Sequence, residues 1–133
     1  MNIPTDLGFS QEHEWVRADG DIATIGITDY AQDQLGDIVY LDLPSPGDSL
    51  SQGGKMGEIE SVKAVSDLYS PVGGELLEVN QAVIDAPELV NEEPYGRGWL
   101  VKLRLSDPAQ MDSLLSAEAY EELITREIEE NTD

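Results

Sequence analysis

The chain lacks cysteine and contains a single histidine, His13, among its 133 residues. Without cysteine it has no disulfides, no thiolate metal ligands and no cysteine nucleophile. A histidine-based metal centre or a serine–histidine relay would have to be built around His13 alone. We therefore expect neither a metal site nor a nucleophilic relay, and for His13 we expect a structural hydrogen bond.

Basic residues are scarce, since seven lysines and arginines face 28 acids and the formal charge is -21. Such a charge argues against binding to nucleic acid or to an anionic membrane. It favours partners with basic surfaces. An equally good interpretation is that the acidity serves solubility or adaptation to high salt and has no specific partner.

Long apolar runs are also missing, because no stretch approaches the roughly 20 residues that a membrane span needs. The first residues, MNIPTDLGFSQEH, have neither the basic and apolar regions of a signal peptide nor the arginine-rich character of a transit peptide. We expect a cytoplasmic protein. At this length residues 1–133 are expected to form one domain with its own core.

Short strand-like segments separated by glycine and proline turns make up most of the chain. Asp19-Gly20 is the clearest hairpin turn. Thr28 resembles an N-cap for a helix over 29–35 that stops at Gly36. Strands are expected over 12–17, 22–28, 38–43, 75–79 and 99–105, with Val39, Leu41 and Leu43 sharing a face of the third, Leu77 and Val79 a face of the fourth, and Trp99, Val101, Leu103 and Leu105 a face of the fifth.

The last third of the chain changes to a helical period. Residues 107–129 are expected to form helices, the first capped by Asp107, with Tyr120, Leu123, Ile124 and Ile128 as an apolar stripe that packs on the sheet. Residues 80–98 are predicted to be irregular with one helical turn near 87–90. Residues 1–11 are expected to be loose and 130–133 to fray. This pattern predicts a β-rich α+β fold with a sandwich or flattened-barrel core.

One lysine stands between two strand-like runs in GEIESVKAVSDLYSPVGG, residues 57–74. We interpret this stretch as a hairpin with Lys63 at its tip, although Ser-Val-Lys-Ala lacks the Asn-Gly or Asp-Gly of common two-residue turns. A short helix through the same residues is the alternative. The other lysines are less suited to carry a group, because Lys102 lies within a strand and Lys55 in a glycine loop without a flanking β pair.

The sequence EIESVKAVSDLYSPVGG closely resembles the lipoyl-attachment segment of H proteins of the glycine cleavage system. Two further stretches support the resemblance. They are HEW at 13–15 with the following ATIGITDYAQDQLGD, and NEEPYGRGWLVK, which is similar to the family's N-x-x-P-Y-x-x-G-W-x-x-K run. The resemblance implies the barrel-sandwich hybrid fold of lipoyl and biotinyl carriers, decorated with helices.

The resemblance also implies a function. Lipoic acid would be attached covalently to Lys63, and the protein, a monomer and not an enzyme itself, would shuttle among three enzymes: glycine decarboxylase, aminomethyltransferase and dihydrolipoyl dehydrogenase. A lipoate ligase or lipoyl transferase would modify it, with Glu60 as part of the recognition surface.

The loaded arm would fold into a cleft lined by Glu14 and Asp67, where two carboxylates hold the cationic cargo away from water. Glu12 stands where the family commonly has a small hydroxyl residue, and it either adds a third carboxylate to the cleft mouth or points into water. Trp15 and Trp99 are expected to be core or cleft-wall aromatics.

Three other functions compete with the carrier of glycine cleavage. The first is an H-like relay that donates lipoate to other complexes or carries another thiol-bound cargo. The second is a small hydrolase that uses Glu14 and Asp67 as acid and base, without need of Lys63. The third is an acidic interaction module without a lipoyl group, acting through the C-terminal helix.

Overall fold

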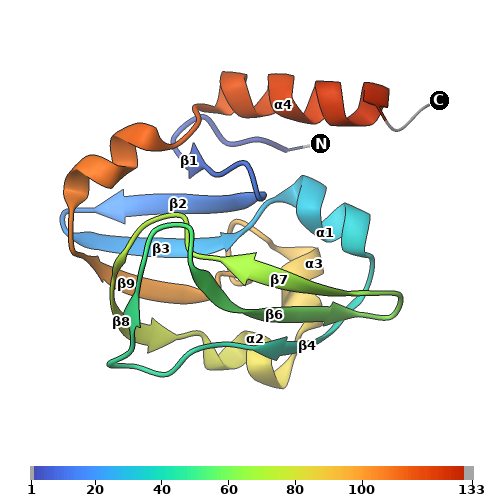
Figure 1. The fold of residues 1–133 in the computed structure, drawn as a ribbon. Helices are drawn as coiled ribbons and strands as arrows, with labels where there is room; N and C mark the ends of the chain where they lie inside the picture. Colours follow the sequence, from blue (N-terminus) through green and yellow to red (C-terminus); the bar gives the residue numbers. More distant parts are fainter. Residues whose placement is uncertain (1, 131–133) are drawn as a thin grey trace.

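The computed structural model describes residues 2–130, which form two stacked antiparallel β-sheets with short helices around them (Figure 1). The larger sheet has six strands in the order β1-β2-β3-β9-β8-β5. Its strands are β1 (Gly8–Phe9), β2 (Glu14–Asp19), β3 (Ile22–Ile27), β5 (Ser49–Leu50), β8 (Gly74–Val79) and β9 (Val101–Leu105). The smaller sheet has the order β4-β6-β7, with strands β4 (Ile38–Asp42), β6 (Lys55–Ser61) and β7 (Val65–Tyr69).

The main hydrophobic core fills the space between the two sheets. Ile25 and Leu103 of the larger sheet and Ile59 and Leu68 of the smaller one belong to the same buried cluster. Over residues 2–130 the sheets make a sandwich and not a closed barrel, which confirms the predicted β-rich α+β fold with a sandwich core. In β9 the predicted alternation holds from Val101 onward, since Val101, Leu103 and Leu105 are buried whereas Arg104 is exposed. The predicted strand starts too early, because Trp99 lies before β9 and is only half-buried.

The first helix forms where the sequence predicts it, as α1 (Asp29–Leu35). The Thr28 hydroxyl accepts a hydrogen bond from the backbone N–H of Ala31, which satisfies one of the free amides of the first turn. Gly36 ends the helix with φ 80°, a conformation that side chains with a Cβ rarely adopt. Both ends are therefore fixed by local chemistry.

Residues 80–98 are more regular than predicted, because they contain two helices, α2 (Gln81–Asp85) and α3 (Glu88–Glu92). Asn80 explains the difference. Its side-chain oxygen caps α2 at the N–H of Ala82, while its amide donates to the carbonyls of Arg97 and Trp99. One buried asparagine thus connects the start of α2 to the end of the loop that precedes β9.

The predicted faces of two strands are wrong, because β-bulges shift their registers. In β4, Ile38 lies opposite Ser61 and Tyr40 opposite Glu60, which leaves Val39 as the extra residue. Ile38 and Leu41 are buried, while Val39 and Tyr40 face solvent. A bulge inserts one unpaired residue and so breaks the period-two alternation on which the prediction rested.

A second β-bulge lies in β8, between Leu76 and Glu78. Leu76 is buried, and Leu77 is only half-buried. Val79 packs against the main core beside Leu76, whereas Leu77 is the extra residue of the bulge, so the prediction that Leu77 and Val79 share a face is wrong.

The ends of the described chain come together in a second, smaller core. Part of the segment expected to be loose forms β1, and Phe9 stacks on Tyr120 of α4 (Ala117–Glu130) with ring centroids 4.7 Å apart. The remaining buried members of this core are Leu7, Trp15, Tyr30 and Ile124. A 3₁₀ helix, Pro108–Ser113, precedes α4, and its first turn is capped by Asp107 as predicted.

The stripe predicted on the last helix is buried only over its first half. Tyr120 and Ile124 are buried, whereas Ile128 is 46% exposed. Of the tail predicted to fray, Glu130 is the last residue of α4 and 131–133 lie outside the described residues. No helix between residues 2 and 130 is both long enough and apolar enough to cross a membrane.

Candidate functional site

Lys63 lies at the tip of the β6–β7 hairpin, with its side chain exposed. The helix considered as an alternative is wrong, because Glu60 of β6 pairs with Val65 of β7. Ser61 closes the turn in place of glycine. Its N–H donates to the carbonyl of Ala64 at 2.8 Å, and its hydroxyl oxygen accepts from the N–H groups of Lys63 and Ala64 at 3.3 and 3.1 Å.

The tip is also bonded to the rest of the protein. The N–H of Val62 donates to the carbonyl of Asp37 at 3.0 Å, which joins the hairpin to the loop after α1. Asn91 of α3 holds that loop from behind, because its amide donates to the carbonyl of Gly36 and its oxygen accepts from the N–H of Ile38. Lys63 therefore stands on a support that is fixed by hydrogen bonds on both sides.

A cleft of about 320 Å³ lies beside the hairpin, between α1, the start of β2, the inner edge of β6–β7 and α4. Lys63 is not among its lining residues. Four carboxylates converge on it, those of Glu12, Glu14, Asp67 and Glu127. The other lining residues are His13, Ile27, Tyr30, Ala31, Gln34, Leu35, Ile59, Ser66 and Leu68. The structure thus brings Glu14 and Asp67 to one cleft, and it adds Glu12 to the wall.

Glu14 is the buried carboxylate of the cleft, with only 2% of its surface exposed. Burial raises its pKa to about 7, because a charged carboxylate loses its hydration in this position, and the charge of Glu12 acts in the same direction. The hydroxyl of Ser10 and the N–H of Tyr69 donate to its two oxygens and oppose the shift. Among residues 2–130, Glu14 has hydrogen-bond donors but no cation against it.

Asp67 differs from Glu14, because its side chain is 45% exposed and already has a cationic neighbour. Nζ of Lys55 lies 3.3 Å from Asp67 and 2.8 Å from Glu58. The expectation that Lys55 lacks a flanking β pair is wrong, since it opens β6 opposite Tyr69. A cation that entered the cleft would have to compete with Lys55 for Asp67.

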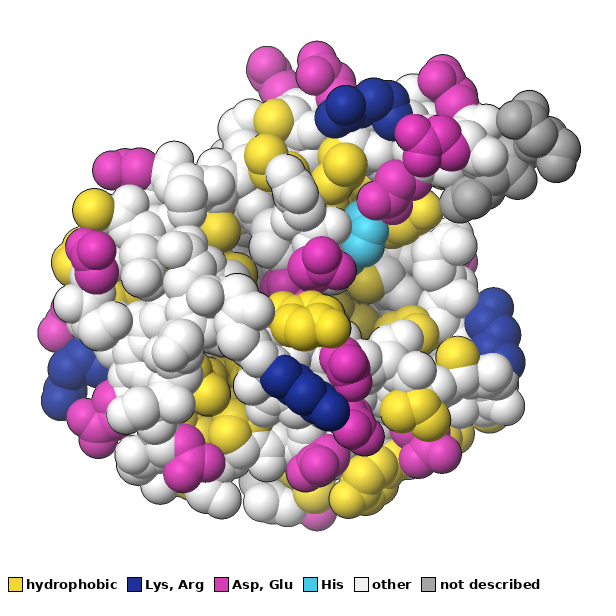
Figure 2. Space-filling view, in the orientation of Figure 1, with side chains coloured by type: hydrophobic (Ala, Val, Ile, Leu, Met, Phe, Trp, Pro, Cys, Tyr) yellow, Lys and Arg dark blue, Asp and Glu magenta, His cyan; other side chains and the backbone are white. Residues whose placement is uncertain are grey.

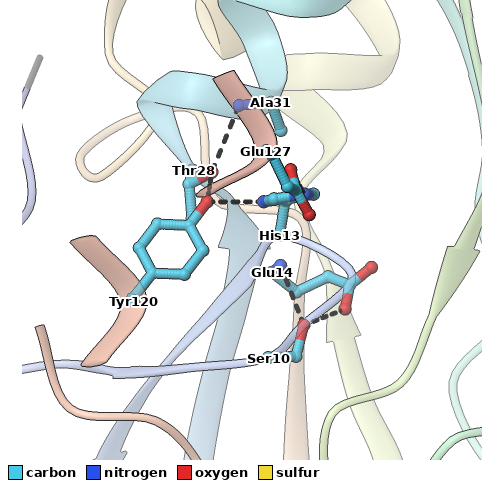
Figure 3. A network of polar contacts seen from close by, with 7 residues as sticks. All are labelled: Ser10, His13, Glu14, Thr28, Ala31, Tyr120 and Glu127. Carbon is cyan, nitrogen blue, oxygen red and sulfur yellow. Dashed lines mark hydrogen bonds and ion pairs between the residues drawn. The ribbon is translucent and has the colours of Figure 1, made fainter. Parts of the chain in front are cut away.

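A hydrogen-bonded chain ties α4 to the wall of the cleft (Figure 3). Nε2 of His13 lies 3.1 Å from Oε2 of Glu127, and its Nδ1 lies 2.8 Å from the hydroxyl of Tyr120. That hydroxyl in turn lies 2.6 Å from Oγ1 of Thr28, the cap of α1. His13 has a φ of 72°, so the backbone turns here and aims the ring at α4.

Sequence reasoning placed His13 in a structural hydrogen bond, as found, but it missed Glu127. The only sequence feature that bears on Glu127 is the apolar stripe of α4. It predicts which face of the helix packs on the protein, but it does not predict which acid reaches the cleft. Trp15 is fully buried and its Nε1 donates to the carbonyl of Pro94, so it is a core aromatic, as predicted.

Comparison with known proteins identifies the family. Residues 7–127 match the family model described as Glycine cleavage H-protein. The chain belongs to the glycine cleavage H-protein family. The Glycine cleavage system H protein of Carboxydothermus hydrogenoformans is 55% identical over 94% of this chain and 96% of its own length. That of Bacteroides thetaiotaomicron is 52% identical over 93% of this chain and 98% of its own length.

A solved structure agrees with these relatives. The crystal structure of a glycine cleavage system H protein from Mycobacterium marinum superposes with a TM-score of 0.85 at 38% identity, and covers 92% of this chain and 99% of that one. The predicted family is therefore confirmed. Its members are lipoate carriers, and the role of the chain is that of the carrier in glycine cleavage, a component of the system that acts together with its other proteins. The relay and the non-lipoyl interaction module are not favoured.

Proposed function

We propose that Lys63 carries the lipoyl group and that the arm so formed moves one-carbon units among the enzymes of glycine cleavage. The observation that supports this most is the exposed amine at the tip of a hairpin whose backbone is bonded on both sides. The amine would displace the activating group from the carboxyl carbon of an activated lipoate. One amide bond forms, and the nitrogen gives up a proton.

The surroundings of Lys63 fit such a group. Its four-carbon stem extends from the tip, and an amide has no charge that would draw the arm back to the acidic surface. When bound, the lipoyl group supplies a disulfide that accepts the aminomethyl unit from glycine decarboxylase, yields it to aminomethyltransferase, and is recovered from the dithiol by dihydrolipoyl dehydrogenase. The protein itself binds, orients and protects, and it catalyses none of these reactions.

Glu14 and Asp67 would hold the cationic end of the loaded arm in the cleft. Glu14 supports this role because its carboxylate is buried and has no cation against it, so an ammonium group would meet little competition from water. Asp67 would contribute from the rim after exchange with Lys55. Glu12 and Glu127, which line the same cleft, add negative charge near the entering cation.

Glu60 would take part in recognition by the lipoate ligase or lipoyl transferase. It is exposed on β6, and the last residue of that strand, Ser61, and the following Val62 lead into the tip. In this proposal the protein works as a monomer, because each partner needs free access to the tip.

Mass spectrometry tests the proposal. The intact protein from cells supplied with lipoate is expected to carry one lipoyl increment, and tryptic mapping is expected to place it on Lys63 and to show that trypsin no longer cleaves there. Lys63→Arg is expected to remove the increment and the glycine exchange of a reconstituted system, with the fold unchanged. Lys55→Arg is the matched control and should keep both.

An increment on another lysine, or exchange that persisted in Lys63→Arg, would contradict the proposal. Hydrolytic activity of the protein that persisted in Lys63→Arg without any covalent adduct would instead support the carboxylate hydrolase considered from the sequence.

A further inference from the structure

Apolar side chains gather in solvent around the tip of the hairpin. Six large hydrophobic residues are exposed between residues 2 and 130, and four of them lie here: Val39 at 49%, Tyr40 at 57%, Val62 at 70% and Val65 at 60%. Scattered single apolar residues are normal on a surface, but a contiguous group marks an interaction site.

The strand register shows that the group is contiguous. Tyr40 of β4 lies opposite Glu60 of β6, and Glu60 lies opposite Val65 of β7, so the three side chains form one row across the smaller sheet. Val62 follows two positions after Glu60, next to Lys63. We call the outward surface formed by Val39, Tyr40, Glu60, Val62 and Val65 the tip face.

An acidic row borders the tip face. Asp42 lies opposite Glu58 and Glu58 opposite Asp67, and each is two positions from a member of the first row, hence on the same side of the sheet. In Figure 2 hydrophobic and acidic side chains alternate over the lower right of the molecule, where Figure 1 places β4, β6 and β7. The pattern of an apolar centre with a charged rim is that of a protein interface.

The bulge at Val39 is what brings this surface about. It turns both Val39 and Tyr40 outward, while Ile38 and Leu41 on either side stay in the core. Bulges re-aim side chains at sites of function, and the fold gains no burial from this one.

We propose that the tip face docks the enzyme that acylates Lys63, and that the complementary surface of that enzyme is apolar with a border of lysine and arginine. This inference rests on the proposed modification of Lys63. The unmodified lysine is short, so the acylating enzyme has to approach within one side-chain length of the tip. Partners of the loaded protein act instead at the far end of a long arm.

The tip face and the cleft are distinct surfaces that share one residue at their border. None of Val39, Tyr40, Glu60, Val62 and Val65 lines the cleft, whereas Asp67 of the acidic row does. Lys55 pairs with Glu58 and Asp67 of the acidic row, so the charge that selects a basic surface and speeds its approach comes from Asp42, Glu60 and the net charge of -21.

The test measures acylation of the purified, unmodified protein by a purified lipoate ligase with ATP and lipoate, followed by intact mass. In the double variant Tyr40→Thr/Val65→Thr we expect KM for the carrier to rise about tenfold, equivalent to about 1.4 kcal/mol, with kcat within a factor of about two. Threonine keeps the β propensity of the strands. Ile128→Thr removes an equally exposed apolar side chain on α4 and should change neither constant.

Charge is tested separately. KM of the wild type is expected to rise with ionic strength, and Glu60→Gln should weaken that salt dependence. A control for folding is urea unfolding of each variant.

Several outcomes would overturn the inference. One is a KM for the double variant equal to that of Ile128→Thr. Another is normal acylation of the double variant combined with failed glycine exchange once it is fully lipoylated, since the tip face would then belong to another partner. If the wild type were not modified at Lys63 at all, the proposed function would fail first, and the mass increment distinguishes the two cases.

Discussion

The hydroxyl of Ser10 donates a 2.5 Å hydrogen bond to Oε1 of Glu14, and the N–H of Glu14 donates back to the same hydroxyl at 3.0 Å. This reciprocal pair, drawn in Figure 3, fixes the orientation of the one buried carboxylate in the cleft. It does not neutralise the charge. Glu14 therefore pays a desolvation cost whenever it ionises in the empty protein.

We expect the stability of the protein to carry a pH dependence from Glu14. Its pKa is about 7 in the folded state, against 4.5 for an accessible glutamate carboxyl. The folded protein thus binds the proton more tightly, so this stabilisation is complete below about pH 4.5 and declines as the pH rises to about 7. The loss is of order 3 kcal/mol.

Urea unfolding between pH 4.5 and 8 of the wild type and of Glu14→Gln measures this effect. The other acids titrate alike in both proteins, so the difference between the two curves isolates Glu14. The free energy of unfolding of the variant should increase relative to that of the wild type as the pH rises. Parallel curves would show that the buried carboxyl titrates normally.

The two predicted cleft carboxylates should contribute unequally to protection of the loaded arm. Glu14 is dry and lacks a cation, while Asp67 is half-exposed and already paired with Lys55. We expect Glu14→Gln to shorten the lifetime of the loaded protein by about tenfold and Asp67→Asn by threefold or less, since exposed ion pairs contribute little. Release of ammonia from the isolated loaded protein is the measurement.

Glu78→Gln, an exposed acid on β8, serves as the control and should leave the lifetime unchanged. A larger effect of Asp67→Asn than of Glu14→Gln would show that the exposed fraction of a carboxylate does not predict how much it protects the loaded arm.

Replacement of Asn91 should loosen the support of the hairpin. Its side chain makes three hydrogen bonds, to the carbonyl of Gly36, the N–H of Ile38 and the side chain of Gln32. Asn91→Ala is expected to lower the free energy of unfolding by about 2–3 kcal/mol. Hydrogen exchange should also quicken at the N–H of Val62, because that amide is bonded to the same loop. Glu92→Ala, at an exposed position of the same helix, should do neither.

The hydroxyl of Tyr120 should matter for the docking of α4. It is buried between His13 and Thr28, and desolvation raises the pKa of the phenol well above its ordinary value. Tyr120→Phe keeps the ring stack on Phe9 but leaves two polar groups without that contact, at a cost of about 2 kcal/mol. Tyr40→Phe removes an exposed hydroxyl and should change stability by less than about 0.5 kcal/mol. Equal stabilities of the two variants would contradict the role assigned to the buried hydroxyl.

Features fixed by neighbouring residues were predicted well from the sequence. Thr28 and Gly36 bound α1 because capping and a left-handed stop act within a few residues. The alternation of β9 held because β9 pairs regularly with β3, and the bulge in its other ladder lies on β8. The hairpin around Lys63 was predicted with help from the resemblance, as Ser61 replaces the glycine that would have announced the turn.

Features that depend on distant residues were not predicted. The bulge at Val39 arises from pairing with β6, and no local residue marks it. The contact of Glu127 with His13 joins residues more than a hundred positions apart, so only the packing of α4 on β1 reveals it. Strand Gly8–Phe9 was missed for the same reason, since its partner Trp15 lies across a turn and its stacking partner lies in the last helix.

The bond from the N–H of Val62 to the carbonyl of Asp37 has a consequence for the order of events in the cycle. The lipoyl arm proposed on Lys63 would start from one fixed point, because the amide of the neighbouring Val62 is anchored. The region that the end of the arm can reach would therefore be a single sphere around that point. Every enzyme that it serves has to bring its active site inside that sphere. In the proposed function, enzymes that occupy the same part of that sphere would exclude one another, and their visits would then take turns.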